Sequence, residues 1–324
     1  MLVNGKWDAD WHPIQKKDTA GRFVRQTSSF RDWITPDASE NNSEVSYPAE
    51  AGRYHLFVAL ICPWASRTLL VRAIKGLEDV ISISIVEPQI TKQGWKFGNF
   101  AGATGHDKQI GAEYVHQLYT HSEAHYTGRA TVPILWDKKT KTIVNNESAD
   151  IIQILNSSFN EFSNTNIDLR PNELLPQISS LNNELYEQLN NGVYKAGFAS
   201  SQLAYEEAFE QVFRMLDKLD GQLADGRKYL LGEQLTESDI RTFVTLIRFD
   251  IAYFGLFKCN LKRIVDYKYL QPYMLRILAL PNIKNTVSVE HIKAGYYSVK
   301  ALNPSGIIPV GPDISQWRIN DENA

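Results

Sequence analysis

The residue best suited to chemistry is Cys62, which stands where a predicted strand ends and a predicted helix begins. A strand is predicted over residues 54–61, because residues 56–61 form an apolar run of the length of a buried strand. Pro63 suits the first position of a helix, because its missing N–H would find no partner there. The unpaired N–H groups and the positive end of the helix dipole then point at the Cys62 sulfur and favour thiolate over thiol. A nucleophilic sulfur needs this electrostatic setting.

A lone cysteine after an apolar run is more often a small buried residue than a nucleophile. The Cys-Pro pair at a strand-to-helix junction favours the nucleophile here. A dithiol redox site would read Cys-x-x-Cys, but the fourth position is Ala65. Cys62 therefore has no neighbouring thiol, and it forms a mixed disulfide only with another molecule. The second cysteine, Cys259, lacks a helix-start context, and we expect it to be structural.

Composition limits the function classes. A chain of 324 residues predicts about two domains, and a net charge of −3 argues against a nucleic-acid partner. No apolar run approaches the roughly 18 residues that span a bilayer, and the first residues lack the apolar core of a signal peptide. Two cysteines predict no disulfide framework and a cytoplasmic location. Ligand-type residues never gather at metal-site spacing, so we expect no metal.

The elements around Cys62 predict a βαβ unit. Residues 63–75 carry apolar side chains on one helical face, and residues 81–86 alternate as a strand does. The strands on either side of this helix should be parallel, with a right-handed crossover. Further along, residues 131–136 and 142–144 predict a hairpin. Pro133 at the start of a strand could be an ordinary trans edge proline, but in a thioredoxin-like order of elements the Val132-Pro133 bond is expected to be cis.

The hairpin leads into a predicted helix over residues 149–159, with Ser148 as its N-cap. A further helix is predicted at residues 111–121, so the order βαβ–α–ββα is that of a thioredoxin-like domain. Helical patterns dominate beyond it, at residues 174–189, 204–223, 240–249, 268–278 and 283–295. Thr236 and Asp239 predict a capping box before the third of these helices, which makes Asp239 structural.

The predicted organisation has five parts. They are an N-terminal extension packing on the body (1–53), a thioredoxin-like domain (54–159) with an insertion (88–130), a linker (160–171), an all-α domain (172–300) and a tail (301–324). An α/β thioredoxin-like domain followed by an all-α domain resembles the glutathione transferase fold. This fold has two domains, which agrees with the number that the chain length predicts.

Several motifs are similar to those of the glutathionyl-hydroquinone reductases, the xi class of glutathione transferases. They are Cys62-Pro-Trp-Ala65, Gly94-Trp95, Arg129-Ala-Thr-Val132-Pro133, Asn146-Glu147-Ser148 and Asn191-Gly-Val-Tyr194-Lys-Ala-Gly-Phe-Ala199. The resemblance extends from Gly5-x-Trp7 through Gly21-Arg-Phe-x-Arg25 and Phe30-Arg-x-Trp33 to Asn303-Pro-Ser-Gly306, nearly the whole chain. One departure is Ser66, where the family often carries His. This difference concerns the tuning of the sulfur and not the class.

The resemblance implies a role for each matching residue. Cys62 is the nucleophile, and Tyr194 donates a proton to the carbon of the leaving hydroquinone. Tyr253 and Tyr296 come from the helical domain and hydrogen-bond near the sulfur or the substrate. From the sequence pattern alone, each tyrosine is equally well a packing residue with a hydrated hydroxyl. Glutathione is held by Trp95, Arg129, the Val132 backbone, Glu147 and Ser148.

The glutathione roles make chemical sense. The Ser148 hydroxyl and the N–H groups of a helix start suit the γ-glutamyl carboxylate, and the Glu147 carboxylate suits the ammonium beside it. Arg129 suits a second carboxylate. The Val132 backbone could pair with an extended peptide. Glutathione would thus be a co-substrate.

The implied reaction has two steps. The Cys62 thiolate attacks the sulfur of a glutathionyl-hydroquinone and releases the hydroquinone, and a second glutathione then frees Cys62 as glutathione disulfide. The implied partners are glutathione and glutathionylated quinols, with a homodimer as the expected assembly. A rival is a general glutathione-dependent thioltransferase or dehydroascorbate reductase. A rival of another class is a non-enzymatic binding module on a transferase fold, which would need neither Cys62 nor Glu147-Ser148.

Overall fold

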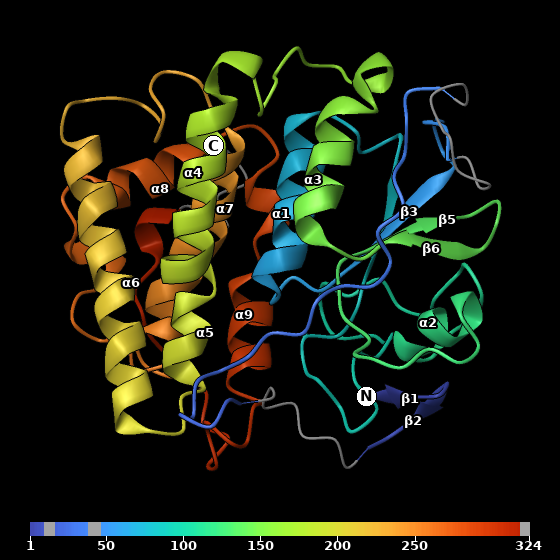
Figure 1. Ribbon diagram of the computed structural model, residues 1–324, viewed down its shortest axis with the longest axis horizontal. Helices are drawn as coiled ribbons and strands as arrows, with labels where there is room; N and C mark the ends of the chain where they lie inside the picture. Colours follow the sequence, from blue (N-terminus) through green and yellow to red (C-terminus); the bar gives the residue numbers. More distant parts are fainter. Residues whose placement is uncertain (10–16, 38–46, 318–324) are drawn as a thin grey trace. The chain divides into compact units, whose positions relative to one another are not determined.

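Figure 1 shows the computed structural model of the chain, which describes residues 1–9, 17–37 and 47–317. Two compact units form in this part of the chain. The first combines residues 1–9 with residues 26–168, and the second combines residues 17–25 with residues 169–317. The predicted N-terminal extension is therefore shared between the units, and its residues 10–16 and 38–46 lie outside the described part.

The first unit is built on a four-stranded sheet in the order β4-β3-β5-β6. Its strands are β3 (Tyr54–Val58), β4 (Ser82–Ile85), β5 (Ile134–Asp137) and β6 (Thr142–Asn145). The β3–β4 pair is parallel, as the βαβ prediction requires, and β5 runs antiparallel to β3 and to β6. Every residue of β3 is buried, which explains why its sequence is apolar without alternation.

Three helices complete this unit in the predicted order: α1 (Pro63–Ile74), α2 (His116–Ser122) and α3 (Ser148–Ser157). Helices α1 and α3 pack against each other, and α2 contacts β6 (Figure 1). This packing holds together the two helices that begin after Cys62 and Glu147. The Val132-Pro133 bond is cis, as predicted.

Three predicted element boundaries in this unit are wrong by three or more residues. Strand β5 begins at Ile134 rather than at residue 131, because Pro133 has no N–H to donate to the ladder. Strand β3 ends at Val58 rather than at residue 61, because the Cys62 N–H turns back to the Ala59 carbonyl at 2.9 Å. Helix α2 begins at His116 rather than at residue 111. The Asp107 carboxylate accepts the N–H groups of residues 109, 110 and 112, and these bonds hold the preceding segment as a loop.

A short hairpin opens the chain, where no periodicity predicted a strand. Strands β1 (Leu2–Val3) and β2 (Lys6–Trp7) are joined by Asn4 and Gly5, both with positive φ, which is the geometry of a two-residue hairpin turn. A Cβ on Gly5 would lie 2.0 Å from the Ala124 carbonyl oxygen, so this position needs glycine.

The predicted linker, residues 160–171, contains the boundary between the units, at Asp168 and Leu169. The first part of this linker is bonded to the first unit. It begins with a 3-10 turn, Asn160–Phe162, and the Lys75 ammonium donates to the Asn160 side chain and the Ile167 carbonyl, both at 2.8 Å.

The second unit is helical. Its α-helices are α4 (Leu175–Glu184), α5 (Gly192–Gly197), α6 (Gln202–Leu223), α7 (Glu237–Arg248), α8 (Leu270–Leu278) and α9 (Val289–Tyr296). Two π-helical segments, Leu185–Asn190 and Phe249–Tyr253, follow α4 and α7, and short 3-10 turns lie at Asn172–Leu174, Ile264–Asp266, Lys284–Thr286 and Ser315–Trp317. The predicted helix at 174–189 therefore changes type at Leu185, and the one at 283–295 begins later, at Val289.

Helix α7 is buried along its whole length, and the capping box predicted at its start is confirmed. The Asp239 carboxylate accepts from the Thr236 N–H at 2.8 Å, the Leu230 N–H at 2.9 Å and the Tyr273 hydroxyl at 2.8 Å. Burial raises the pKa of Asp239. This carboxyl therefore acts as a buried anchor for three segments of the helical unit.

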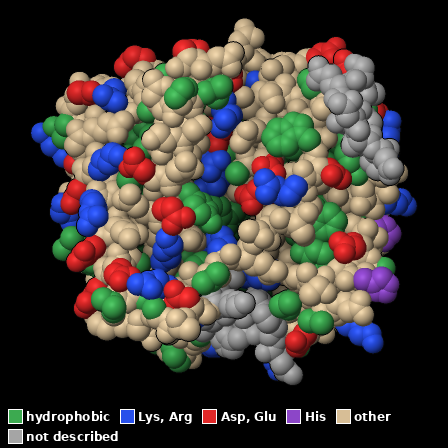
Figure 2. All heavy atoms as spheres, viewed as in Figure 1, with side chains coloured by type: hydrophobic (Ala, Val, Ile, Leu, Met, Phe, Trp, Pro, Cys, Tyr) green, Lys and Arg blue, Asp and Glu red, His purple; other side chains and the backbone are tan. Residues whose placement is uncertain are grey.

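The surface charge and the hydropathy of the helices bear on nucleic-acid and membrane partners. On the face shown in Figure 2, basic and acidic side chains are interspersed, in keeping with a net charge of −3. Within the described residues, no helix has both the length and the apolar character needed to cross a bilayer.

Candidate functional site

Cys62 lies at the N-cap of α1, where the sequence places it, with Pro63 as the first helical residue. Its backbone is extended, and its carbonyl accepts the first helical hydrogen bond, from the Ser66 N–H at 2.9 Å. The thiol is partly exposed and donates to the Val132 carbonyl oxygen, with the sulfur 3.6 Å from that oxygen. A partly exposed sulfur at the start of a twelve-residue helix has the position of a nucleophile.

Val132 and Arg129 belong to one segment that leads into β5. Val132 is buried and precedes the cis bond, and its carbonyl faces the Cys62 thiol. Arg129 is partly exposed, and its carbonyl accepts from the Tyr126 hydroxyl at 3.3 Å. The structure thus brings Cys62 and Val132 into contact and places Arg129 three residues before Val132.

The β6–α3 junction corrects one prediction: the N-cap of α3 is Glu147, and Ser148 is the first residue of the helix. The Glu147 N–H donates to the Asn145 side chain at 2.7 Å, which turns the chain one residue earlier than predicted. The Glu147 carboxylate then accepts from the Ala149 N–H at 3.0 Å. Ser148 is buried, and its hydroxyl donates to the same carboxylate at 3.4 Å.

Ser28 is a contact of Glu147 that sequence reasoning missed. Its hydroxyl donates to the second Glu147 carboxylate oxygen at 2.9 Å, across 119 positions of sequence. Beside it, Arg31 pairs with Asp150 in the first turn of α3. No local signal pointed to Ser28, whereas Arg31 lies in the Phe30-Arg-x-Trp33 motif of the resemblance, to which no role was assigned.

Trp95 lies in the predicted insertion, partly exposed, directly after a tight turn closed by Thr91 and Gly94. Gly94 has a φ of +80°, and a Cβ there would lie 3.1 Å from the Trp7 ring. Trp7 in turn stacks on His116, with ring centroids 4.6 Å apart. The initial hairpin therefore supports the segment that carries Trp95.

The three tyrosines predicted from the resemblance lie together in the helical unit. The Tyr296 hydroxyl is 2.7 Å from the Tyr194 hydroxyl and 2.8 Å from the Tyr253 hydroxyl, so it bridges the other two. Burial raises the pKa values of Tyr253 and Tyr296 well above the usual value. Both phenols therefore stay protonated at neutral pH, and the half-buried Tyr194 forms the outer end of a chain of hydroxyls.

Arg25 is a second residue that the roles drawn from the sequence left out. Its guanidinium carbon lies 5.1 Å from the centre of the Tyr194 ring, and its Nε donates to the Asn191 side chain at 2.9 Å. The Gly21-Arg-Phe-x-Arg25 motif was the available signal. This motif belongs to the second unit, as Tyr194 does, although most of the N-terminal extension belongs to the first unit.

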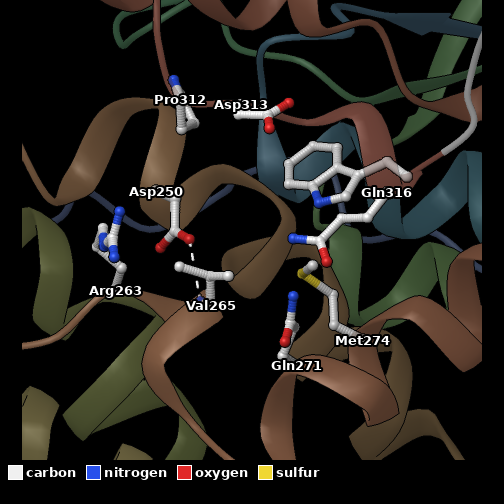
Figure 3. Close-up of a pocket in the computed structure, with 9 residues that line it drawn as sticks. Asp250, Arg263, Val265, Gln271, Met274, Pro312, Asp313 and Gln316 are labelled. Carbon is white, nitrogen blue, oxygen red and sulfur yellow. Dashed lines mark hydrogen bonds between the residues drawn. The ribbon is translucent and has the colours of Figure 1, made fainter.

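A cavity of about 220 Å³ lies elsewhere in the helical unit (Figure 3). Its walls include Arg263, Gln271, Met274 and the tail residues Pro312 and Trp317. The Asp250 carboxylate in its wall is engaged by the Ile264 and Val265 N–H groups at 2.6 and 3.2 Å. None of the predicted site residues lines this cavity.

Over the described residues, no cluster of three or more His, Cys, Asp or Glu side chains has the arrangement of a metal site. The predicted site residues fall instead into two groups. Cys62, Trp95, Arg129, Val132 and the Glu147–Ser148 pair belong to the first unit, and the tyrosines belong to the second.

Comparisons with known proteins identify the family to which the two units belong. The model of the family "Glutathione S-transferase, N-terminal domain" matches residues 61–158, and that of "Glutathione S-transferase, C-terminal domain" matches residues 202–276. The glutathionyl-hydroquinone reductase YqjG of Escherichia coli (strain K12) is 46% identical over 99% of this chain and 97% of its own length. The glutathionyl-hydroquinone reductase PcpF of Sphingobium chlorophenolicum is 45% identical over 96% of each chain.

Solved structures give the same result. The glutathione-bound structure of YqjG superposes with a TM-score of 0.87 at 44% identity, covering 97% of this chain and 96% of that one. The xi glutathione S-transferase of Phanerochaete chrysosporium also gives a TM-score of 0.87, at 45% identity, over 92% of this chain and 95% of that chain. These matches confirm the predicted fold, a thioredoxin-like domain followed by an all-α domain.

Proposed function

Because the chain belongs to the xi class of glutathione transferases, the family of the glutathionyl-hydroquinone reductases, we propose that it reduces glutathionyl-hydroquinones to hydroquinones at the expense of glutathione. One observation carries the proposal: Cys62 stands at the start of α1, with no second cysteine in its turn. A cysteine becomes covalently attached to the glutathionyl group, whereas a serine or tyrosine there would only polarise the glutathione thiol.

In the first step, the Cys62 thiolate attacks the sulfur of the glutathionyl-hydroquinone. A sulfur–sulfur bond forms, and the bond from sulfur to the aromatic carbon breaks. The electron pair of that bond leaves with the carbon, which takes a proton from Tyr194 to give the hydroquinone. The carbon is thereby reduced by two electrons, and the two sulfur atoms are oxidised to the mixed disulfide.

In the second step, a free glutathione ionises and its thiol proton replaces the one that Tyr194 gave up. The resulting thiolate attacks the glutathionyl sulfur on Cys62. The mixed disulfide breaks, glutathione disulfide leaves, and the Cys62 thiolate is restored. The overall reaction consumes one glutathionyl-hydroquinone and one glutathione and yields one hydroquinone and one glutathione disulfide. The kinetics should be ping-pong, because the first product leaves before the second glutathione reacts.

The residues of the first unit would hold glutathione by complementary chemistry. The Glu147 carboxylate would pair with the γ-glutamyl ammonium, and the Ser148 hydroxyl with the first N–H groups of α3 would face its carboxylate. Arg129 would pair with the glycyl carboxylate, and Trp95 would cover the peptide. The Val132 backbone would pair with the cysteinyl residue of glutathione, because its carbonyl already faces Cys62.

The tyrosines would serve the aromatic product. Tyr194 would donate the proton, and Tyr296 and Tyr253 would fix its hydroxyl through the short contacts that join the three. We further propose a cytoplasmic homodimer that uses no metal. The low cysteine content supports the compartment, and the family resemblance supports the dimer. Sedimentation equilibrium of the purified protein would test the dimer.

The function is tested by steady-state turnover of the Cys62→Ala variant beside a matched control. Cys259→Ala is that control, because Cys259 is fully buried and burial raises the pKa of its thiol to about 12. We expect reductase turnover on a glutathionyl-hydroquinone to vanish in Cys62→Ala and to persist in Cys259→Ala. Substantial turnover by Cys62→Ala would refute the covalent step.

The same assay separates the rivals. Faster turnover of small disulfides or dehydroascorbate than of glutathionyl-hydroquinones would identify a general thioltransferase or dehydroascorbate reductase, since Cys62 supports those reactions as well. A non-enzymatic module would turn over none of these substrates, and it would gain no glutathionyl adduct when incubated with glutathione disulfide.

A further inference from the structure

The Tyr119 hydroxyl, in the first unit, makes hydrogen bonds to both of the segments that carry proposed glutathione-binding residues. The Tyr119 hydroxyl donates to the Thr131 carbonyl at 2.8 Å, and it accepts from the Thr131 N–H at 3.1 Å and the Asn146 side-chain amide at 3.0 Å. The same hydroxyl also lies 3.3 Å from the Thr131 hydroxyl, so it makes contacts with both segments at once. Thr131 directly precedes Val132, and Asn146 directly precedes Glu147.

Tyr119 is suited to this bridging role. Its side chain projects from α2, and it is fully buried. Burial raises the pKa of Tyr119 to about 12, so the phenol stays protonated and keeps both donor and acceptor functions at neutral pH. Buried hydrogen bonds of this kind are costly to lose, because the partner groups have no water to replace them.

The second arm of the bridge continues into the N-terminal extension. The Asn146 side-chain oxygen accepts from the Phe30 N–H at 3.1 Å, and the Asn146 N–H donates to the Phe30 carbonyl at 3.0 Å. The Phe30 ring packs edge-on against the Tyr119 ring, with centroids 5.7 Å apart. Two residues before Phe30, the Ser28 hydroxyl bonds the Glu147 carboxylate.

A second tyrosine supports the first arm in the same way. The Tyr126 ring packs on Tyr119 at 5.0 Å, and its hydroxyl donates to the Arg129 carbonyl. The segment from Arg129 to Val132 and the segment from Asn146 to Ser148 are thus attached to one aromatic cluster. They do not depend only on their own strands for their relative position.

We propose that Tyr119 is a positioning residue for glutathione, which sets the spacing between the arm that ends at Val132 and the arm that begins α3 without touching the ligand. The proposal rests on the proposed function, since it assigns both arms to glutathione. Pairing with the peptide backbone at Val132 and with the γ-glutamyl end at Glu147 requires both arms at a fixed separation. A phenol that bonds both arms supplies that constraint.

A test uses the Tyr119→Phe variant, with Tyr54→Phe as the matched control. Tyr54 is fully buried in the same unit, and its hydroxyl makes one hydrogen bond, to the Pro48 carbonyl at 2.7 Å. Both substitutions remove a tyrosine hydroxyl from the same unit, but only the first detaches the two arms. Isothermal titration calorimetry with reduced glutathione gives the Kd, and thermal unfolding of each variant reports on stability.

We expect Tyr119→Phe to raise the Kd for glutathione about tenfold and to raise KM, while kcat changes by less than about threefold. Tyr54→Phe should lower the thermal midpoint but leave the Kd unchanged. An unchanged Kd in Tyr119→Phe, or an equal rise in Tyr54→Phe, would overturn the positioning role. Wild-type protein that binds no glutathione would instead refute the proposed function.

Should Tyr119→Phe fail to fold, Asn146→Ala tests the same link from its other end. It removes the amide that Tyr119 accepts from, and it should likewise raise the Kd. Where both variants fold, the double variant should bind glutathione more tightly than the product of the single effects predicts, since both break one connection. A loss equal to or larger than that product would count against a shared bridge.

Discussion

The proton-donor role of Tyr194 leads to a prediction that the structure makes quantitative. Tyr194→Phe removes a hydroxyl that lies 2.7 Å from the Tyr296 hydroxyl and leaves the ring packed against Phe257, with centroids 5.4 Å apart. The substitution therefore deletes the donor and little else. Loss of a general acid slows the step that needs its proton by about 100-fold or more.

Tyr296→Phe is a graded companion to this variant. It leaves the Tyr194 hydroxyl in place but removes the bridge between Tyr194 and Tyr253. A hydrogen bond of that kind contributes about 1 kcal/mol, so we expect turnover to fall roughly five- to tenfold. Tyr297→Phe is the control, because its hydroxyl bonds the Ile251 carbonyl at 3.0 Å and belongs to the next position of the chain.

Rapid-quench measurement of hydroquinone release in a single turnover is the appropriate assay, with glutathione affinity measured in parallel. Wild type and Tyr297→Phe should release hydroquinone fastest, Tyr296→Phe more slowly, and Tyr194→Phe most slowly. Normal hydroquinone release by Tyr194→Phe together with weaker glutathione binding would refute the proton-donor role. Equal slowing by Tyr297→Phe would point to a general packing defect.

The other predictions concern binding and stability. Glu147→Gln should weaken glutathione binding about tenfold or more in calorimetry, and Ser28→Ala only a few-fold, because the Ala149 N–H still holds the carboxylate. Asp239→Asn should lower the free energy of unfolding in urea by about 2–4 kcal/mol without changing kcat, since an amide nitrogen replaces an oxygen that accepts two of four buried hydrogen bonds. At Asp137, burial opposes ionisation, but hydrogen bonds from Arg53 and its neighbours outweigh it and lower the pKa. Its stabilising effect is present above the unfolded-state pKa and lost as pH falls through the folded-state pKa, so Asp137→Asn should flatten the acid dependence of the unfolding free energy.

The parts of this fold that the sequence predicted well are those with a local chemical signature. Pro63 marks the start of α1, and Thr236 with Asp239 marks the start of α7, because a cap needs a particular side chain at a particular offset. The β6–α3 junction is where this logic failed by one residue. Glu147 and Ser148 are both able to cap, and the bond from the Glu147 N–H to Asn145 decides between them.

The contacts that complete the candidate site had no such signature. Tyr194 and Tyr296 are 102 positions apart, and Ser28 and Glu147 are 119 positions apart. Hydrogen bonds between residues so distant depend on how helices and strands pack, which neither periodicity nor propensity specifies. The resemblance supplied the tyrosines and Glu147, but it assigned no role to Ser28 or Tyr119.

The most direct test of the covalent mechanism is mass spectrometry of the intact protein after the first of the two steps. The reduced enzyme is mixed with a glutathionyl-hydroquinone in the absence of free glutathione, and the products are separated. The covalent mechanism predicts one glutathionyl group on Cys62 for each hydroquinone released, and removal of that group on addition of glutathione. Hydroquinone released from an enzyme that carries no adduct at Cys62 would contradict it.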